Sequence, residues 1–195
     1  KGKEADGSMG SDVPLAVLSD RSPSLFSYFK QRFAQVSNPA IDPIRESIVM
    51  SLQASVGPEL NLLEESPNHA HQLVMPQPVL QNEELHRLRN VDHYVFDTET
   101  LDCTWPASEG PAGLERAVDR PCAEAAPAVG LGVTVLILSD RAAGHDRVPV
   151  PALLAVSAVH HNLVRRGTRL RTGIVVESGE PREVHQLGCL LGYGA

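Results

Sequence analysis

Side chains that could bind a metal or transfer a proton are scattered along this chain. His69 and His71 lie two residues apart, and His160 and His161 are adjacent. A zinc site needs histidines one helical turn apart or cysteines in Cys-x2-Cys pairs, because the ligands must converge on one ion. Neither spacing occurs, so the sequence predicts no metal site. We expect His161, near the end of a helix, to interact with the helix dipole.

The three cysteines show no pattern of nucleophilic chemistry. Cys103 lies in a segment typical of a strand, and Cys122 and Cys189 lie among small apolar residues in segments typical of helices. No base can be paired with any of them from the sequence. We therefore interpret them as packed thiols, and an odd number of widely spaced cysteines predicts no disulfide framework.

Glycine patterns indicate no cofactor site. The segment 7–10 contains two glycines but lacks the lysine and the spacing of a phosphate-binding loop. Gly130 and Gly132 precede a strand, whereas a dinucleotide fingerprint follows one. From the residues alone we predict no catalytic residue and no cofactor-binding residue in this chain.

The composition is that of an ordinary soluble domain. The chain has 195 residues, of which 42% are hydrophobic and 21% are charged, and its net charge is −7. This acidic balance, without a basic stripe, argues against nucleic-acid binding. The longest apolar run, 133–138, is far shorter than the roughly 20 residues of a membrane span, and no signal peptide opens the chain. We expect a cytoplasmic protein without membrane contact.

The segment 132–195 predicts a β-α-β-α unit. Two apolar runs, 133–138 and 173–176, are rich in β-branched residues, as in strands buried on both faces. A segment with helical spacing follows each run. Strands joined by crossover helices run parallel, so the predicted fold class is α/β with a mostly parallel sheet. Ligands often bind at the carboxyl ends of such strands, which here carry Ser139-Asp140-Arg141 and Glu177-Ser178-Gly179.

The first part of the chain should be a loop over 1–12, followed over 13–58 by a strand, a helix, a loop and a second helix. Residues 14–18 are typical of a short buried strand. Phenylalanines at three- and four-residue spacing predict a helix over 25–35.

The second of these helices has a recognisable start. Asp42 is a good N-cap, and Pro43 suits the first helical position because its missing N–H needs no partner there. We expect this helix to turn Ile44, Ile48 and Val49 inward and to end near Gly57.

Residues 59–90 predict the least regular part of the chain. Prolines recur there, and we expect a surface segment with a short helix near 68–73. Acidic residues at the start of 82–90 predict a second short helix, since carboxylates suit a helix N-terminus.

Residues 91–131 predict a strand near 94–104 and a helix over 113–128. Pro121 and Pro127 lie inside that helix. A proline in a helix interior costs about 3 kcal/mol, so we expect the helix to be interrupted.

Long strings along the chain match one known family. They are GSMGSD at 7–12, PLAVLSD at 14–20, YFKQ at 28–31, FAQVSNP at 33–39, IDPIRE at 41–46, VMSL at 49–52, LILSDR at 136–141, PALLAV at 151–156 and VESGE at 176–180. In these strings the chain resembles the central domain of the large, glutamine-using subunit of glutamate synthase. The resemblance covers nearly the whole chain. Neither end is typical of a natural terminus, so we expect a fragment of that larger domain.

The resemblance implies a place in a large multidomain oxidoreductase. In that enzyme an amidotransferase domain releases ammonia from glutamine, and the ammonia passes through an internal tunnel to a flavin-bearing barrel. There it joins 2-oxoglutarate, and FMN, supplied with electrons through a 3Fe-4S cluster, reduces the product to glutamate. The chain would connect these two sites and wall the tunnel. It lacks the amidotransferase cysteine, the FMN barrel and the cluster cysteines, so we expect the isolated chain to hold no cofactor and to be inactive.

The resemblance also implies which residues approach the tunnel and the flavin site. They are Met9 and Gly10 in one loop and Ser37, Asn38 and Pro39 in a second. Ser37 stands where the family usually has threonine, which keeps the hydroxyl and loses a methyl group. The alternative interpretation, that Ser37 and Asn38 only cap a turn, stays open.

The expected partners are the neighbouring amidotransferase and FMN domains of the same polypeptide, with a small electron-transfer subunit or ferredoxin. The cytoplasm is the expected location, or the plastid stroma for a photosynthetic eukaryote. Two other functions fit the residues. One is a noncatalytic α/β scaffold or interaction module; the other is a small-ligand domain that uses the strand ends around Arg141. For that last site we predict no binding of 2-oxoglutarate or another anion, and a ligand-induced thermal shift that mutation of Arg141 abolishes would contradict this.

Overall fold

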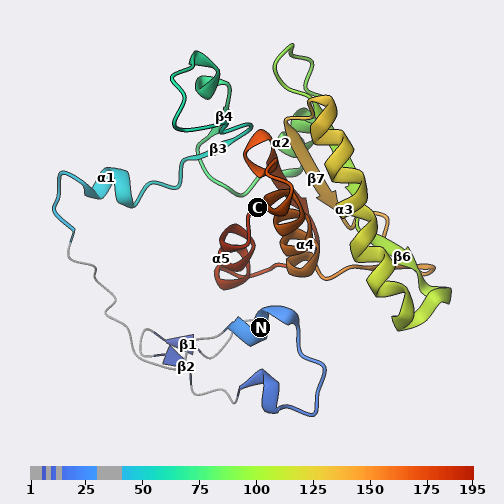
Figure 1. Cartoon of the computed structure of the whole chain (residues 1–195). Helices are drawn as coiled ribbons and strands as arrows, with labels where there is room; N and C mark the ends of the chain where they lie inside the picture. The colour runs from blue at the N-terminus through green and yellow to red at the C-terminus, as the bar shows by residue number, and fades with distance from the viewer. Residues whose placement is uncertain (1–5, 8–9, 12–14, 30–40) are drawn as a thin grey trace.

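A parallel sheet organises the second half of the chain. The computed structural model describes residues 6–7, 10–11, 15–29 and 41–195. In it, β5 (Thr98–Asp102), β7 (Val135–Ser139) and β9 (Gly173–Glu177) form a three-stranded sheet in the order β5-β7-β9, and both pairings are parallel (Figure 1). The predicted α/β class with a parallel sheet is confirmed.

The central strand β7 is buried on both faces. Leu136 and Leu138 lie in one apolar cluster, and Val135 and Ile137 lie in another on the opposite face. Successive side chains of a strand point to opposite faces, so burial on both sides requires an apolar residue at nearly every position. This explains why the sequence shows a continuous apolar run here rather than an alternating pattern.

Three helices cover one face of the sheet. They are α3 (Gly113–Leu131), α4 (Ala152–Arg165) and α5 (Val184–Gly192), and α4 contacts both of the others. In α4 the buried residues Val156, Val159 and Leu163 recur at three- and four-residue spacing, which is the apolar stripe of a helix packed on a core. The structure has helices in both predicted segments of 132–195, and α4 is the crossover helix between β7 and β9.

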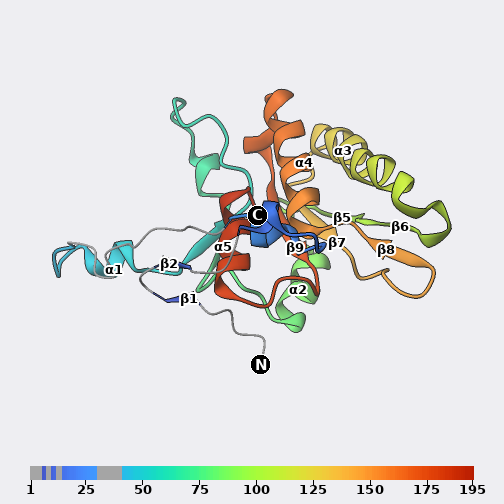
Figure 2. The same ribbon diagram turned by 90° about the horizontal axis from the view of Figure 1, so that it is seen from below.

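The other face is covered by α2 (Asn82–Arg89) and by an antiparallel pair, β3 (Ala54–Val56) and β4 (Leu73–Met75). Figure 2 shows α2 on the opposite side of the strands from α3 and α4. The helix predicted over 82–90 is confirmed, and its first turn is capped by Gln81, whose N–H donates to Glu84 Oε2 at 2.7 Å.

The predicted strand near 94–104 is divided in two. After β5 the chain turns at Cys103 and forms β6 (Thr104–Pro106), which pairs antiparallel with β8 (Arg147–Pro149). The Asp102 carboxylate stabilises the turn, because its Oδ1 accepts bonds from the Thr104 N–H at 3.0 Å and the Thr104 hydroxyl at 2.7 Å. A 3₁₀ segment, η4 (Ala107–Ala112), leads from β6 into α3.

The predicted interruption of the 113–128 helix is wrong. Helix α3 runs without a break for 19 residues past Pro121 and Pro127, and it ends where Gly132 adopts a left-handed φ of 105°. Each proline removes one backbone donor. The buried residues Ala125 and Val129 nevertheless hold this helix against the core, so tertiary packing outweighs the local cost.

Two predictions in the first part of the chain are corrected. Residues Ala16–Leu18 form a short 3₁₀ turn, η1, rather than a buried strand, and the Val17 and Leu18 side chains are 71% and 77% exposed. In place of the predicted helix over 25–35, the described residues Leu25–Phe29 form a 3₁₀ helix, η2, in which Phe26 is buried. Residues 30–35 lie outside the described part.

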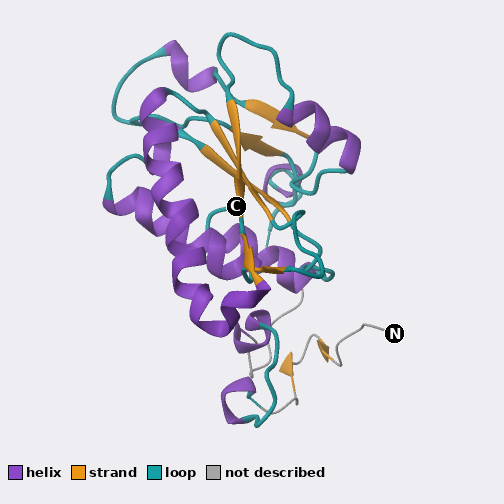
Figure 3. Cartoon of the chain, turned by 90° about the vertical axis from the view of Figure 1, so that its right-hand side faces the viewer, coloured by secondary structure: helices purple, strands orange, loops and turns teal. Residues whose placement is uncertain are grey.

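The helix predicted after Asp42 is shorter and differently oriented. Asp42 does cap a turn, since its Oδ1 accepts from the N–H groups of Ile44 at 3.1 Å and Arg45 at 3.0 Å. The helix that follows, α1 (Glu46–Val49), is a single turn, and Ile44 and Ile48 are 86% and 75% exposed. The predicted inward face is therefore wrong, because α1 lies apart from the sheet (Figures 1 and 2), whereas other helices flank the strands on both sides (Figure 3).

The remaining elements are short. The predicted helix near 68–73 is a 3₁₀ turn, η3 (Pro67–Ala70), and β4 begins at Leu73. Another 3₁₀ turn, η5 (Arg169–Arg171), precedes β9, and β1 (Asp6–Gly7) pairs with β2 (Gly10–Ser11). No helix in the described ranges has the length and apolarity needed to cross a lipid bilayer.

The continuous helix α3 makes a testable prediction about its prolines. Pro127 is exposed and Pro121 is buried. Replacing Pro127 with alanine restores a backbone donor at little packing cost, so Pro127→Ala should raise the free energy of unfolding by about 1–2 kcal/mol. Pro121→Ala is the matched control and should gain less, because it also removes buried ring atoms. Denaturant midpoints measure both; a Pro127→Ala variant that is no more stable than the parent would contradict the prediction.

Candidate functional site

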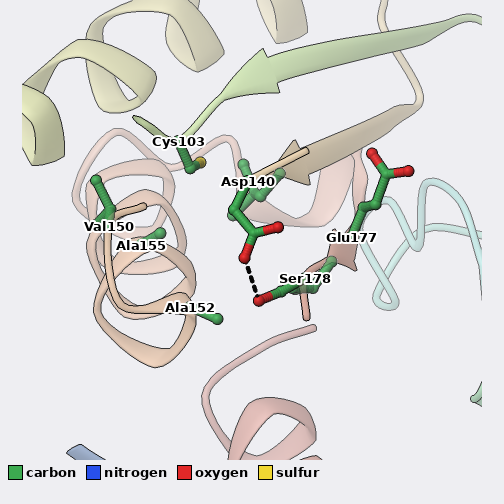
Figure 4. A pocket seen from close by; sticks show the side chains of 9 residues that line it. Cys103, Asp140, Val150, Ala152, Ala155, Glu177 and Ser178 are labelled. Carbon is green, nitrogen blue, oxygen red and sulfur yellow. Dashed lines mark hydrogen bonds between the residues drawn. The ribbon is translucent and has the colours of Figure 1, made fainter. Parts of the chain in front are cut away.

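The two polar motifs predicted at the strand ends lie side by side. Ser139 and Glu177 are register partners across β7 and β9, and the Asp140 N–H donates to the Glu177 carbonyl at 3.0 Å. Beyond the strands, the Ser178 hydroxyl donates to Asp140 Oδ2 at 2.5 Å (Figure 4). The parallel sheet thus brings together residues 38 positions apart.

Glu177 is the centre of this cluster. Its side chain is 12% exposed, and its Oε2 accepts bonds from the Ser139 hydroxyl at 2.5 Å and from Arg89 Nη2 at 2.7 Å. Arg141 Nη1 lies 3.3 Å from Oε1. Burial by itself raises the pKa of the Glu177 carboxyl. The hydrogen bonds from Ser139 and Arg89 and the positive charges outweigh burial, so the net pKa is lowered and Glu177 is held as a carboxylate.

A second carboxylate occupies the N-terminus of α4. Glu180 Oε2 accepts a bond from the Ala152 N–H at 2.8 Å, and the Glu180 N–H donates to the Ser178 hydroxyl at 3.1 Å. The N-terminus of a helix attracts anions because its first N–H groups are unpaired and its dipole is positive there. In this fold a side chain of the chain itself fills that position.

Between these groups lies only a small hollow. The volume of this hollow is about 10 Å³, which is about the volume that one water molecule needs. Its lining residues are Cys103, Leu138, Asp140, Val150, Ala152, Ala155, Val176, Glu177 and Ser178. The polar groups at the strand ends therefore bond mainly to one another, and their arrangement favours a structural junction between β7, β9, α2 and α4.

The cysteines are placed as packed thiols. Burial raises the pKa of Cys103 to about 12, and burial also raises the pKa values of Cys122 and Cys189. Cys189 Sγ lies 3.8 Å from His185 Nε2, but the same nitrogen lies 3.3 Å from the Phe26 carbonyl oxygen. A thiol with a raised pKa is a weak nucleophile at neutral pH, so the geometry agrees with the sequence interpretation.

Two of the histidines considered in the sequence, His69 and His161, contact backbone carbonyls. His69 places Nδ1 2.8 Å from the Glu59 carbonyl and Nε2 2.8 Å from the Glu64 carbonyl. His161 Nδ1 lies 2.8 Å from the Ser157 carbonyl one turn earlier in α4. Within residues 6–7, 10–11, 15–29 and 41–195, no three histidine, cysteine or acidic side chains are grouped to hold a metal ion.

Sequence reasoning missed Arg89 of this cluster and the position that Glu180 takes in it. Arg89 is 88 positions from Glu177, and nothing in its local sequence points to that contact. Glu180 did carry a signal, since an acid near a helix start suits the dipole. That signal pointed to the helix that follows Glu180, whereas the structure shows its carboxylate on α4.

The predicted tunnel residues fall mostly outside the described part of the chain. Gly10 lies in β2, where it pairs with Gly7. Met9, Ser37, Asn38 and Pro39 are not among the described residues, so their proposed role stays a prediction.

Comparison with known proteins identifies the family. The sequence model of one protein family, the glutamate synthase central domain, matches residues 1–195. The chain belongs to the glutamate synthase central domain family. This central domain is 50% identical over its whole length to glutamate synthase [NADH] of Schizosaccharomyces pombe. It is 45% identical to the glutamate synthase [NADPH] large chain of Bacillus subtilis and 44% identical to the ferredoxin-dependent, chloroplastic glutamate synthase of Spinacia oleracea.

This central domain is a small part of those relatives. It covers 9% of the Schizosaccharomyces pombe protein and 12% of the Bacillus subtilis and Spinacia oleracea proteins. The resemblance stated from the sequence strings is confirmed, and the chain corresponds to about a tenth of each relative.

The Glu177 cluster predicts a pH-dependent stability. The lowered pKa of Glu177 means that its contribution is present above the ordinary glutamate value of 4.5 and is lost as pH falls through the folded-state pKa. At pH 7, Glu177→Gln should lower the free energy of unfolding by about 2 kcal/mol, because charged hydrogen bonds become neutral ones. The exposed residue Glu99 of β5 supplies the matched control, Glu99→Gln.

Urea unfolding at several pH values checks this prediction. The difference between the parent and Glu177→Gln should shrink below pH 4.5, while Glu99→Gln should stay close to the parent throughout. A difference of the same size at pH 7 and pH 3 would contradict a carboxylate role.

Proposed function

We propose that this chain is the connecting domain of a glutamate synthase, placed between a glutamine amidotransferase domain and an FMN domain that binds 2-oxoglutarate. The observation that carries the proposal is the family match over residues 1–195, with relatives of which this segment is 9–12%. The larger enzyme would form two glutamates from glutamine, 2-oxoglutarate and a reductant. FMN and the 3Fe-4S cluster would belong to its other domains.

An exposed apolar surface supports a connecting role. Residues 44–52, which we name the apolar arm, include α1 and carry five large apolar side chains between 54% and 86% exposed. They are Ile44, Ile48, Val49, Met50 and Leu52. Clustered apolar side chains in water mark an interaction surface, and burying one such side chain stabilises an interface by about 1.5–3 kcal/mol. We propose that a neighbouring domain of the same polypeptide covers the apolar arm.

The proposed contribution to chemistry is exclusion of water. Ammonia that escapes into solvent is lost to the reaction, so a wall around its path must be closed and must offer few hydrogen-bonding groups. We propose Met9, Gly10, Ser37, Asn38 and Pro39 for this wall, where the Ser37 hydroxyl and the Asn38 amide could accept from or donate to ammonia in transit.

The names of the relatives support a site for the electron donor outside this segment. Their names specify NADH, NADPH or ferredoxin, yet each is 44–50% identical to this same segment. A donor site would have to differ between them, so we propose that a small electron-transfer subunit or ferredoxin interacts with other parts of the enzyme. We propose a cytoplasmic location, or the plastid stroma for a chain from a photosynthetic eukaryote.

The second candidate function is a noncatalytic scaffold without the enzyme's activity. An activity assay distinguishes this scaffold from the connecting domain of an active enzyme. The full polypeptide that contains this sequence should fluoresce as a flavoprotein and form glutamate from glutamine and 2-oxoglutarate. Without flavin and without glutamine-dependent turnover, the scaffold would be the better conclusion.

The proposed wall makes a testable prediction: a bulky side chain placed in the ammonia path should make ammonia escape into solvent. In the full polypeptide, Ser37→Trp should block transfer while leaving glutamine hydrolysis, so that glutamate formed per glutamine consumed falls from two toward one and free ammonia appears. The matched control is Ser108→Trp at an exposed serine of η4, which should keep the full ratio. An unchanged ratio in Ser37→Trp would favour the alternative in which Ser37 only caps a turn.

The apolar arm predicts a domain contact. In the full polypeptide, Ile48→Asp should weaken the contact by about 2 kcal/mol, because a charge replaces an apolar side chain that the proposed contact buries. Limited proteolysis at the arm should then become several-fold faster. Leu131→Asp, at an apolar residue of α3 that is 89% exposed, is the control and should leave proteolysis unchanged. Equal proteolysis rates in both variants would contradict the proposed contact.

A further inference from the structure

A loop between β3 and η3 is held in a strained backbone conformation. We name its residues 59–64 the clasped loop. Leu60 has a left-handed φ of 58°, which glycine adopts easily and leucine does not. The Glu59 and Leu60 N–H groups both donate to the Leu170 carbonyl of η5, at 2.8 and 3.0 Å. Strained backbone persists only where surrounding contacts fix it, and the Leu170 carbonyl fixes the first end of this loop.

The other end of the clasped loop is a turn that bonds to itself. The Glu64 N–H donates to the Asn61 carbonyl at 3.0 Å, and the Leu63 N–H donates to Asn61 Oδ1 at 3.1 Å. Asn61 Nδ2 donates in turn to Glu64 Oε1 at 2.9 Å. These bonds shape the turn without attaching it to a neighbouring element, so a further group has to hold it in place.

His69 of η3 supplies that attachment. Its Nδ1 lies 2.8 Å from the Glu59 carbonyl oxygen, and its Nε2 lies 2.8 Å from the Glu64 carbonyl oxygen. A carbonyl oxygen only accepts, whereas a neutral imidazole has a proton on one nitrogen and a lone pair on the other. In either neutral tautomer, one of the two contacts would therefore place two acceptors against each other. Both contacts are hydrogen bonds only when both nitrogens carry protons, as in the imidazolium.

The surroundings of His69 favour the charged ring. The hydrogen bond to the Glu59 carbonyl and then that to the Glu64 carbonyl raise its pKa above the ordinary value of 6.5; loss of solvation opposes them, and the Glu64 carboxylate adds to them. The titratable and charged groups on the bordering segments are Glu59, Glu64, Glu65, His71 and, on η5, Arg169 and Arg171.

The direction of the pKa shift fixes the pH range in which the imidazolium acts. Because the folded-state pKa of His69 is raised, the contribution of the charged ring is fully present below pH 6.5 and is lost as the pH rises through the folded-state value. The two hydrogen bonds are therefore present together on the acid side and not on the alkaline side.

We propose that His69 is a proton-dependent clasp, which holds the loop 59–64 at both ends as an imidazolium and releases the Glu64 end when it loses its proton. The first end stays in place, because the Leu170 carbonyl also holds it. The released end carries Leu62 and Leu63, whose side chains are 76% and 94% exposed. The clasp thus controls how this apolar turn is presented, and it does not depend on the connecting role proposed above.

The pKa of His69 tests the clasp directly. In the full polypeptide, deuterium exchange at the ring Cε1 position, read by mass spectrometry, reports the protonation of a single histidine. His71→Gln removes the neighbouring histidine from the same peptide. It is also a matched control, because the His71 ring bonds to neither carbonyl among the described contacts. We expect His69 to titrate above 6.5 in this variant, and a midpoint at or below that value would overturn the proposal.

Amide exchange of the loop tests its release. Between about pH 5.5 and about pH 8.5, the protection of peptide 59–66, relative to the unfolded chain at each pH, should fall about three- to tenfold as one hydrogen bond is lost. The midpoint should match that of the His69 ring. Protection of β7 should stay constant, which excludes general unfolding as the cause.

A second variant shows that the ring proton is responsible. His69→Gln should give the lower protection of peptide 59–66 at every pH, because glutamine has its donors on a single nitrogen and cannot donate to both carbonyls. His71→Gln should keep the pH dependence of the parent. Constant protection of the loop in the parent across this pH range would refute the clasp, whether or not His69→Gln folds.

Discussion

The fold depends on the burial of β7 on both faces. Helices α3 and α4 can pack on Leu136 and Leu138 only because α2 and the β3–β4 pair cover Val135 and Ile137 on the other side. Removing either layer would expose half of a continuous apolar strand to water, at about 25 cal/mol for each Å² of apolar surface. The two layers therefore support each other through a single strand.

The same strand sets the position of the polar junction. Because β7 and β9 run parallel and in register, Ser139 and Glu177 lie next to each other at one edge of the sheet. Glu177 then joins Arg89 of α2, and Glu180 caps α4. In many α/β proteins this edge binds a ligand. Here carboxylates of the chain occupy the positions that an anion would take, which agrees with the connecting role proposed above.

The exposed apolar surface of this domain agrees with its membership of a family of much longer proteins. The relatives are about ten times longer than this segment, and the apolar arm has no covering element among residues 15–29 and 41–195. A domain that works inside a larger polypeptide can keep apolar side chains on its surface, because its neighbours cover them.

The sequence by itself determined the features that depend on neighbouring residues. The apolar run of β7, the helix after Gln81 and the turn at Asp42 were predictable, since strand pattern and capping act within a few residues. Long matching strings also determined the family. Only the tertiary structure decided the Arg89–Glu177 pair, the continuity of α3 through Pro121 and the outward face of α1. Each of these depends on which distant surface packs against the segment, and local spacing carries no information about that.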